Sequence, residues 1–325
     1  MLIINPYRFV AGGPGPGGTY NSATARYWRL GWQESVTGST PACSRLWFLD
    51  DTETLITPSG GTAFASSVLS SFVAANAFDG NDATHWISGT GTTEDDTIDA
   101  WLAYDFGAGN DKTISGVRYR SRAQSSGVNQ GPRFAVLQYS SDGAAWTTLF
   151  RIVNTVVYSA SGTTVDWVDK AKYSGGHRYW RLNVTETQNS GRFSIQQTTL
   201  HVGDDTGVDI VTNAGQGVMG DGITSSAPVL PRFWVGKAMD QESGTRFSDG
   251  TTAGTGQIVW DFGPVNAPDV TDLTLISTDA SFGANEAPID FTLDYSDNGS
   301  TWTTALTVTG DTGWTQNETR IYNLP

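Results

Sequence analysis

The 325-residue chain contains a single cysteine, Cys43, and only three histidines. One cysteine cannot form an intrachain disulfide, and it cannot supply a cysteine-rich metal site. Basic residues are also scarce, because 19 lysines and arginines stand against 33 aspartates and glutamates, which gives a formal net charge of −14. Since no run of lysine or arginine is present to neutralise phosphates, we expect no nucleic-acid partner.

Long apolar runs are missing as well. No stretch approaches the roughly 18–20 apolar residues that a membrane-spanning helix needs. The first nine residues, MLIINPYRF, have no basic segment of the kind that begins a signal peptide. We therefore expect no membrane insertion and no export through the secretory route.

Signatures of catalysis are equally scarce. The histidines His85, His177 and His201 are too scattered to indicate a metal site or a triad, and no G-x-S-x-G elbow occurs. Residues 215–220, GQGVMG, match the dinucleotide pattern G-x-G-x-x-G, but DGITSSAP follows instead of the helix that must bind the pyrophosphate. We therefore expect that the protein is not an enzyme.

What the chain does contain is one pattern used twice. The pentapeptide RYWRL at residues 26–30 returns at 178–182, an offset of 152 residues (178 minus 26). WLAYDFG at 101–107 returns as IVWDFG at 258–263. A Tyr-Ser turn with glycine and a closing tryptophan follows each copy, and a shared offset over such distances indicates an internal repeat.

Short alternating segments separated by turn residues fill both copies, and no long stripe of helical period is present. Each repeat supplies about eight strands, so we predict an all-β chain of two tandem jelly-roll sandwiches. The expected domains are 1–18, a docking peptide and Gly/Pro linker, then 19–172 and 173–325. Alternation should bury Leu102, Tyr104 and Phe106 together. The tryptophans of the repeated frame are also expected in the core: Trp86, Trp101, Trp146 and Trp302.

The motifs resemble a known family. A-F-D-G-x-x-x-T-x-W at 77–86, W-x-x-Y-D-F-G, Y-S-x-D-G-x-x-W and R-Y-W-R-L are together similar to the discoidin-like, coagulation-factor C-type module. The resemblance covers nearly all of residues 26–172 and, more weakly, 178–325. It implies a galactose-binding-like jelly roll whose loops at one end bind sugars, lipid headgroups or proteins.

The order of the motifs departs from that family, in which the R-Y-W-R-L strand comes late in the module. Here one copy precedes the first module, and no copy follows the second. We therefore expect a permuted order in which each repeat begins with this strand. The alternative is that residues 178–203 close the first domain.

The resemblance also implies a cofactor, since calcium commonly lies in the A-F-D-G-x-x-x-T turn of this family. A hard cation prefers oxygen ligands. The glutamate that relatives often add after R-Y-W-R-L is missing, and the alternative is a turn held by its own hydrogen bonds. The candidate ligands in the two copies of the turn are Asp79, Asp82, Thr84, Asp240, Ser243 and Thr245, with backbone oxygens of Phe78 or Asn81.

A carbohydrate site would need an aromatic platform and polar groups that reach sugar hydroxyls. Residues 123–133 have the composition of a loop at the tip of a sandwich. The alternative for each candidate is an ordinary surface group. The candidates are His85, Trp32, Arg120, Arg122, Asn129, Gln130 and Arg133.

The first residues resemble the start of tail and other virion proteins of bacteriophages. An apolar segment followed by the flexible run at 12–18 indicates a docking peptide; the alternatives are a disordered end or a strand packed on the first domain. The docking residues would be Ile3, Ile4, Pro6, Tyr7 and Phe9.

We therefore expect a non-enzymatic phage virion protein of the tail, fibre or spike. It would be released by lysis, assembled as an oligomer, with a trimer as the expected state, and bound to neighbouring virion proteins or host-surface carbohydrate. Two alternatives remain: a purely structural decoration or adaptor protein, and a carbohydrate-binding accessory module of a bacterial enzyme.

Overall fold

The chain forms two compact units, Met1–Ala171 and Lys172–Pro325. The computed structural model describes most of both units. The described residues are 20–36, 40–93, 97–125, 130–154, 158–171, 174–189, 191–202, 208–209, 216–219, 222–225, 235–239, 245–249, 253–279 and 286–325.

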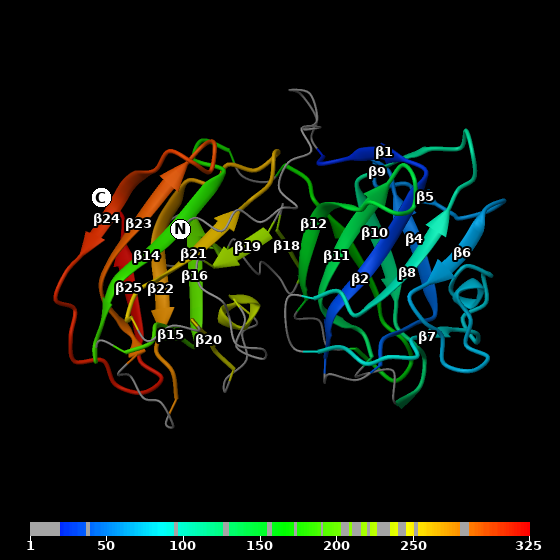
Figure 1. The fold of residues 1–325 in the computed structure, drawn as a ribbon. Helices are drawn as coiled ribbons and strands as arrows, with labels where there is room; N and C mark the ends of the chain where they lie inside the picture. The colour runs from blue at the N-terminus through cyan, green and yellow to red at the C-terminus, as the bar shows by residue number, and fades with distance from the viewer. Residues whose placement is uncertain are drawn as a thin grey trace. The chain divides into compact units, whose positions relative to one another are not determined.

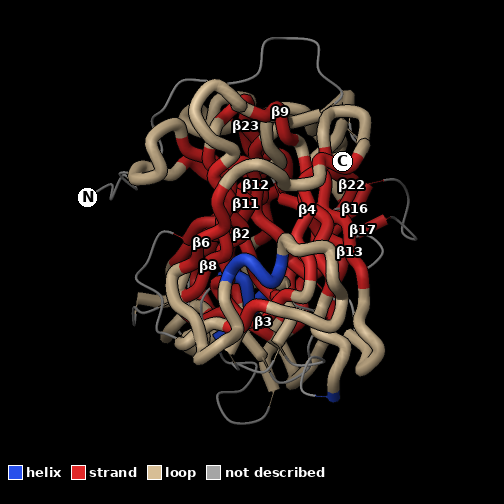
Figure 2. Tube along the Cα trace, turned by 90° about the vertical axis from the view of Figure 1, so that its right-hand side faces the viewer, coloured by secondary structure: helices blue, strands red, loops and turns tan. Residues whose placement is uncertain are grey.

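Strands and turns make up nearly all of the described residues, as Figure 2 shows, and the predicted all-β fold class is confirmed. No helix in the described part is long and apolar enough to cross a bilayer. The elements of the first unit are β1 (Ala23–Ala25), β2 (Tyr27–Ser35), β3 (Ala42–Cys43), β4 (Arg45–Leu49), β5 (Leu55–Ile56), β6 (Thr62–Ala65), the 3-10 helix η1 (Ala74–Ala77), β7 (Trp86–Ile87), β8 (Ala100–Asp105), β9 (Lys112–Ile114), β10 (Gly116–Arg120), β11 (Pro132–Ser140), β12 (Thr147–Asn154) and β13 (Thr164–Val168).

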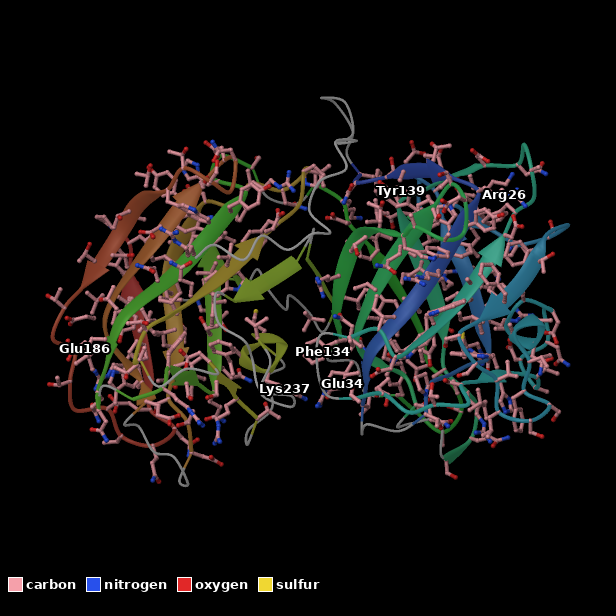
Figure 3. The ribbon with its side chains drawn as sticks, viewed as in Figure 1. Arg26, Glu34, Phe134, Tyr139, Glu186 and Lys237 are labelled. Atoms are coloured by element: carbon pink, nitrogen blue, oxygen red, sulfur yellow. The ribbon has the colours of Figure 1, made fainter. Side chains whose placement is uncertain are left out.

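Two antiparallel sheets build the first unit. Within this unit one sheet has the strand order β12-β11-β2-β8-β6, and the other has the order β13-β10-β4-β5. Strand β2 lies between β11 and β8 (Figure 1) and pairs with both along its length. Figure 3 shows Glu34 and Phe134 at one end of β2 and β11, with Arg26 and Tyr139 toward the other end.

The core of the first unit lies between these sheets. Alternation along β2 sends Trp28, Leu30 and Trp32 inward, where each is 0% exposed. Trp28 packs on Phe48 of β4 with ring centroids 6.3 Å apart, and Trp32 packs on Tyr119 of β10 at 6.1 Å. Large aromatic side chains from both sheets therefore fill one core.

The inner face of β8 is as predicted, because Leu102, Tyr104 and Phe106 are all buried. Trp86 is also buried, but the expectation that Trp101 lies in the core is wrong. Trp101 alternates with Leu102 and therefore points to the outer face of the sheet, where it is half-buried. Trp146 and Trp302 are half-buried as well, since each lies beneath an arginine side chain and not between sheets.

The second unit has its own pair of sheets. Their strand orders are β19-β21-β14-β23-β24 and β17-β16-β22-β25. The elements are β14 (Tyr179–Thr187), β15 (Ser194–Ile195), β16 (Gln197–Val202), β17 (Val208–Asp209), β18 (Gln216–Met219), β19 (Gly222–Ser225), the 3-10 helix η4 (Val235–Ala238), β20 (Phe247–Ser248), β21 (Gly256–Asp261), β22 (Val270–Ile276), β23 (Pro288–Ser296), β24 (Thr303–Val308) and β25 (Thr319–Asn323).

The strand pairings assign each R-Y-W-R-L segment to a unit. Residues 27–30 open β2, which fills the place between β8 and β11. Residues 179–182 open β14, which fills the corresponding place between β21 and β23 of the second unit. Strand β14 therefore pairs within the second unit, and the central strand of each unit comes early in that unit.

The repeated arginine and aspartate form the same two-bond ion pair in both units. Arg26 donates from Nε and Nη2 to the carboxylate of Asp105 at 2.6 and 2.7 Å, and Arg178 does the same to Asp261 at 2.7 and 3.0 Å. Asp105 also accepts from the backbone N–H of Gly107 at 2.7 Å. Gly107 has a φ of 89°, a conformation that glycine adopts without strain. The W-x-x-Y-D-F-G motif is thus strand β8 followed by the turn that ends it.

Candidate functional site

Two arginines meet a carboxylate at one end of the first unit. Arg45 begins β4 and Arg120 ends β10, and the two residues are directly paired in register. Asp82, from the turn before β7, approaches both: its Oδ1 lies 2.8 Å from Arg45 Nε and its Oδ2 lies 3.4 Å from Arg120 Nε. The structure therefore brings together Asp82 and Arg120, which the sequence placed in two different predicted sites.

The turn itself is held by internal hydrogen bonds. Asp79 accepts from the backbone N–H of Asn81 at 2.7 Å and from the hydroxyl of Thr84 at 2.6 Å. The Thr84 hydroxyl also lies 2.8 Å from the carbonyl oxygen of Asn81. These are the contacts of a turn stabilised by its own side chains.

These contacts decide how well the turn fits calcium. A calcium ion needs several oxygens with free lone pairs around one point, whereas Asp79 faces two donors and Asp82 faces two guanidinium groups. In this arrangement Asp79, Thr84 and the carbonyl of Asn81 lie together, whereas Asp82 pairs with Arg45 and Arg120. Among the described residues no group of three or more His, Cys, Asp or Glu side chains is placed to hold a metal.

The second copy of the turn falls mostly outside the described residues. Asp240 and Ser243 lie there, and Thr245, which is described, is half-buried. The calcium prediction at this turn therefore stays a prediction.

A second cluster lies beside the first. The ring of His85 stacks on Phe72, with centroids 4.8 Å apart and an interplanar angle of 16°. The guanidinium of Arg122 lies 5.9 Å from the centroid of the same phenyl ring. Arg122 Nη1 donates to the side-chain oxygen of Gln130 at 3.2 Å, and Gln130 in turn donates to Thr40 at 3.4 Å. Three predicted sugar-site residues therefore do come together.

Burial sets the electrostatics of this cluster. His85 is 6% exposed, and burial, followed by the nearby charge of Arg122, lowers its pKa, so the neutral imidazole is favoured. Burial also lowers the pKa of Arg122. Nε2 of His85 and Nε of Arg122 are buried without a hydrogen-bond partner. Such atoms cost free energy until a partner reaches them.

Other candidates have different places. The prediction for Trp32 is wrong, because this side chain is 0% exposed and cannot form a platform for a sugar ring. Arg133 is 9% exposed and forms an ion pair with Glu34, with 3.4 Å between Nη1 and Oε1. Asn129 lies outside the described residues, as do the proposed docking residues Ile3, Ile4, Pro6, Tyr7 and Phe9.

Sequence reasoning missed two members of this end of the unit. Arg45 lies two residues after the only cysteine and belongs to no motif, and its role depends on its pairing with Arg120 across two strands. Phe72 supplies the shared aromatic face, and three exposed apolar side chains surround it in sequence. Those side chains are Val68, Leu69 and Val73. A run of apolar residues in a turn-rich segment was the available signal.

The fold and this end of the strands define a class: an antiparallel β-sandwich with polar side chains gathered at one end is typical of modules that bind through loops. Residues 62–196 match the family model described as the F5/8 type C domain. The match covers most of the first unit and continues past residue 171 through β14 of the second unit. No curated protein matches the chain.

The limits of that match agree with the permuted order. The matched segment includes residues 178–182 near its end, where the discoidin-like family has its R-Y-W-R-L strand. In the structure this strand belongs to the second unit, and β2 takes its place in the first. The family model and the first unit therefore use different copies of the same pentapeptide.

Proposed function

We propose that the chain is a non-enzymatic binding protein made of two discoidin-like modules, and that the first binds carbohydrate at the cluster of His85, Arg122 and Gln130. The observation that carries the proposal is the pair of unpartnered polar atoms, His85 Nε2 and Arg122 Nε, beside the half-buried ring of Phe72. A neutral imidazole and a guanidinium can both bond sugar hydroxyls, and an aromatic face suits the apolar side of a pyranose ring.

Support for a second module comes from the strand pairings. The two units repeat the same order of neighbours around β2 and β14, and both contain the arginine–aspartate ion pair. The tip of the second unit differs, since Arg246 and Phe247 stand where the first unit has His85 and Trp86 in the aligned turn. The proposed sugar site therefore belongs to the first module alone.

A glycan array with the full chain tests the proposal, and Arg122→Ala is the informative variant. Loss of hydrogen bonds from a charged donor should weaken binding roughly tenfold or more. Arg118→Ala is the matched control, because Arg118 lies on β10, shortly before Arg122, but pairs with Asp166 at 2.6 Å. If both variants lose binding equally, or if the wild type binds no glycan, the site is misassigned.

We further propose a bacteriophage virion as the setting, with the protein on the tail, fibre or spike. The support is the segment IINPYRF followed by the Gly/Pro run at 12–18. Docking through that segment would present several copies on one particle, and an oligomer, expected to be a trimer, would raise the effective concentration of weak sites. The structural alternative would use the same modules to hold neighbouring virion proteins.

Purified particles provide the test of this setting. Mass spectrometry should find the chain in the virion, and deletion of residues 1–18 should abolish its incorporation while leaving glycan binding intact. A truncated chain that still joins the particle would remove the docking role from this segment. A stable complex with virion proteins, without any glycan binding, would favour the structural alternative.

A further inference from the structure

An arginine lies between two tryptophans on the outer face of the first unit, away from the His85 cluster. Arg29 is on the central strand β2, and its guanidinium carbon lies 5.3 Å from the ring centroid of Trp101 and 4.2 Å from that of Trp146. Phe64 of β6 packs edge-on against Trp101 at 5.6 Å. Strands β11, β2 and β8 lie side by side here (Figure 1), and Arg29 of β2, Trp101 of β8 and Trp146, just before β12, form one aromatic and cationic surface.

The floor of this surface is made of small residues. Arg29 pairs in register with Ala103 of β8, and Gly31 pairs with Trp101. Ala103 is buried and pairs on its other side with Phe64, while the side chains of Ile98 and Val136 lie against Gly31. Trp101 and Arg29 remain half-buried, neither sealed in the core nor fully solvated.

The guanidinium is only partly satisfied within the protein. Arg29 Nε donates to the side-chain oxygen of Gln138 at 2.7 Å, and Gln138 donates to the hydroxyl of Thr148 at 3.0 Å. No carboxylate of the described residues forms an ion pair with Arg29, and its Nη1 and Nη2 donate no hydrogen bond to those residues. Burial lowers the pKa of Arg29 to about 10, so the group still carries its charge at neutral pH.

The second unit provides a comparison at the equivalent position. Arg181 lies over Trp302 with 4.3 Å to the ring centroid, as Arg29 lies over Trp146. Asp294 stands where the first unit has Gln138, and its Oδ2 accepts from Arg181 Nε at 3.0 Å and from Nη2 at 2.6 Å. The two units therefore share the frame, but only the second neutralises its arginine with a carboxylate of its own.

We propose that the Arg29–Trp101–Trp146 surface binds the carboxylate of an acidic saccharide, such as a hexuronic acid within a polysaccharide. The two free amino groups of the guanidinium match the two oxygens of a carboxylate. The ligand carboxylate occupies the place that Asp294 fills in the second unit, and the indole rings contact the apolar side of the sugar ring. The assignment of the anion to a saccharide rests on the proposed function, whereas this site lies on a different surface from the His85 cluster.

The substitution Gln138→Asp tests this inference directly. It installs the carboxylate that the second unit already holds against its arginine, in a frame where that arrangement is folded. Calorimetric titration of the full chain with trigalacturonic acid should show binding that weakens about tenfold or more in this variant, because a charge-assisted contact is lost. The control Gln257→Asp makes the same change of charge in the second unit, at the position equivalent to Trp101, and should leave the affinity unchanged.

The neutral trisaccharide galactotriose separates this site from the His85 cluster. Binding of trigalacturonic acid that survives Arg122→Ala but not Gln138→Asp supports the outer-face site, whatever happens to neutral sugars. Equal affinity of wild type and Gln138→Asp for the acid, or no binding of the acid by wild type, overturns the inference. Displacement by acetate at the same carboxylate concentration would overturn the saccharide assignment. Loss of neutral-sugar binding in Arg122→Ala bears on the proposed function alone.

Discussion

Replacing the tryptophan of one R-Y-W-R-L segment should destabilise the unit that contains it and spare the other. Trp28 is 0% exposed and Trp180 is 3% exposed. Trp28 packs on Phe48 at 6.3 Å between ring centroids and donates from Nε1 to the carbonyl of Ala25 at 3.0 Å. Replacement of a buried tryptophan by alanine costs about 3–5 kcal/mol. For a domain of this size that loss lowers the melting temperature by roughly 10 °C.

The single cysteine allows the two units to be followed separately. Cys43 is buried in the first unit, its Sγ donates to the carbonyl of Arg45 at 3.1 Å, and burial raises the pKa of its thiol. Such a thiol reacts with an alkylating reagent only when the surrounding structure opens. Pulsed alkylation at increasing temperature therefore reports the unfolding of the first unit, while circular dichroism reports both.

The expected outcome is asymmetric. Trp28→Ala should lower the temperature at which Cys43 becomes reactive, and Trp180→Ala should lower a transition seen by circular dichroism while the alkylation midpoint stays within about 2 °C of wild type. If Trp180→Ala shifted the alkylation midpoint as far as Trp28→Ala does, β14 would be needed to complete the first unit. That result would refute the assignment of β2 and β14 to separate units.

Three further predictions concern charges. Arg26 holds the pKa of Asp105 below its usual value, so this pair stabilises the fold above about pH 4, and the stabilisation is lost as pH falls through the lowered pKa. Asp105→Asn should lower the free energy of unfolding in urea at pH 7 by about 1–3 kcal/mol and should make stability less dependent on pH in the acid range. An unchanged acid dependence in this variant would contradict the pairing. Burial lowers the pKa of His85, so stability should fall as pH drops below about 6.5, and His85→Gln should remove that dependence of the urea midpoint. Calcium should leave the melting temperature unchanged because Asp82 faces two arginines, and a rise that Asp79→Ala abolishes would show that the turn rearranges to bind the ion.

The repeated frame of this fold could be predicted from the sequence because its signals are local. The alternation of Trp28, Leu30 and Trp32 places all three on one face of a strand, and the structure buries all three. The same alternation should have placed Trp101 opposite Leu102, on the outer face. The tryptophan was assigned to the core because it recurs within a repeated motif, although recurrence does not show which face a side chain occupies.

The candidate site could be predicted only in part, because it depends on pairings between distant segments. Arg45 and Arg120 meet through the register of β4 and β10, which no local pattern specifies. His85 and Arg122 were both named, but their common contact with Phe72 was not foreseen. Trp32 was taken for a platform although its alternation with Trp28 and Leu30 places it on the same buried face of β2.

The position of the central strand at the start of each unit has a consequence during synthesis. The ribosome makes β2 before its neighbours β8 and β11, so β2 stays unpaired in the sheet until they are made. The first unit can complete its two sheets once β12 and β13 have been made. Strand β14, which begins with the same residues YWRL, is made only afterwards, when β2 already lies between β8 and β11. Vectorial synthesis in this order guards against exchange of the two R-Y-W-R-L strands, which refolding of the full-length chain from denaturant does not.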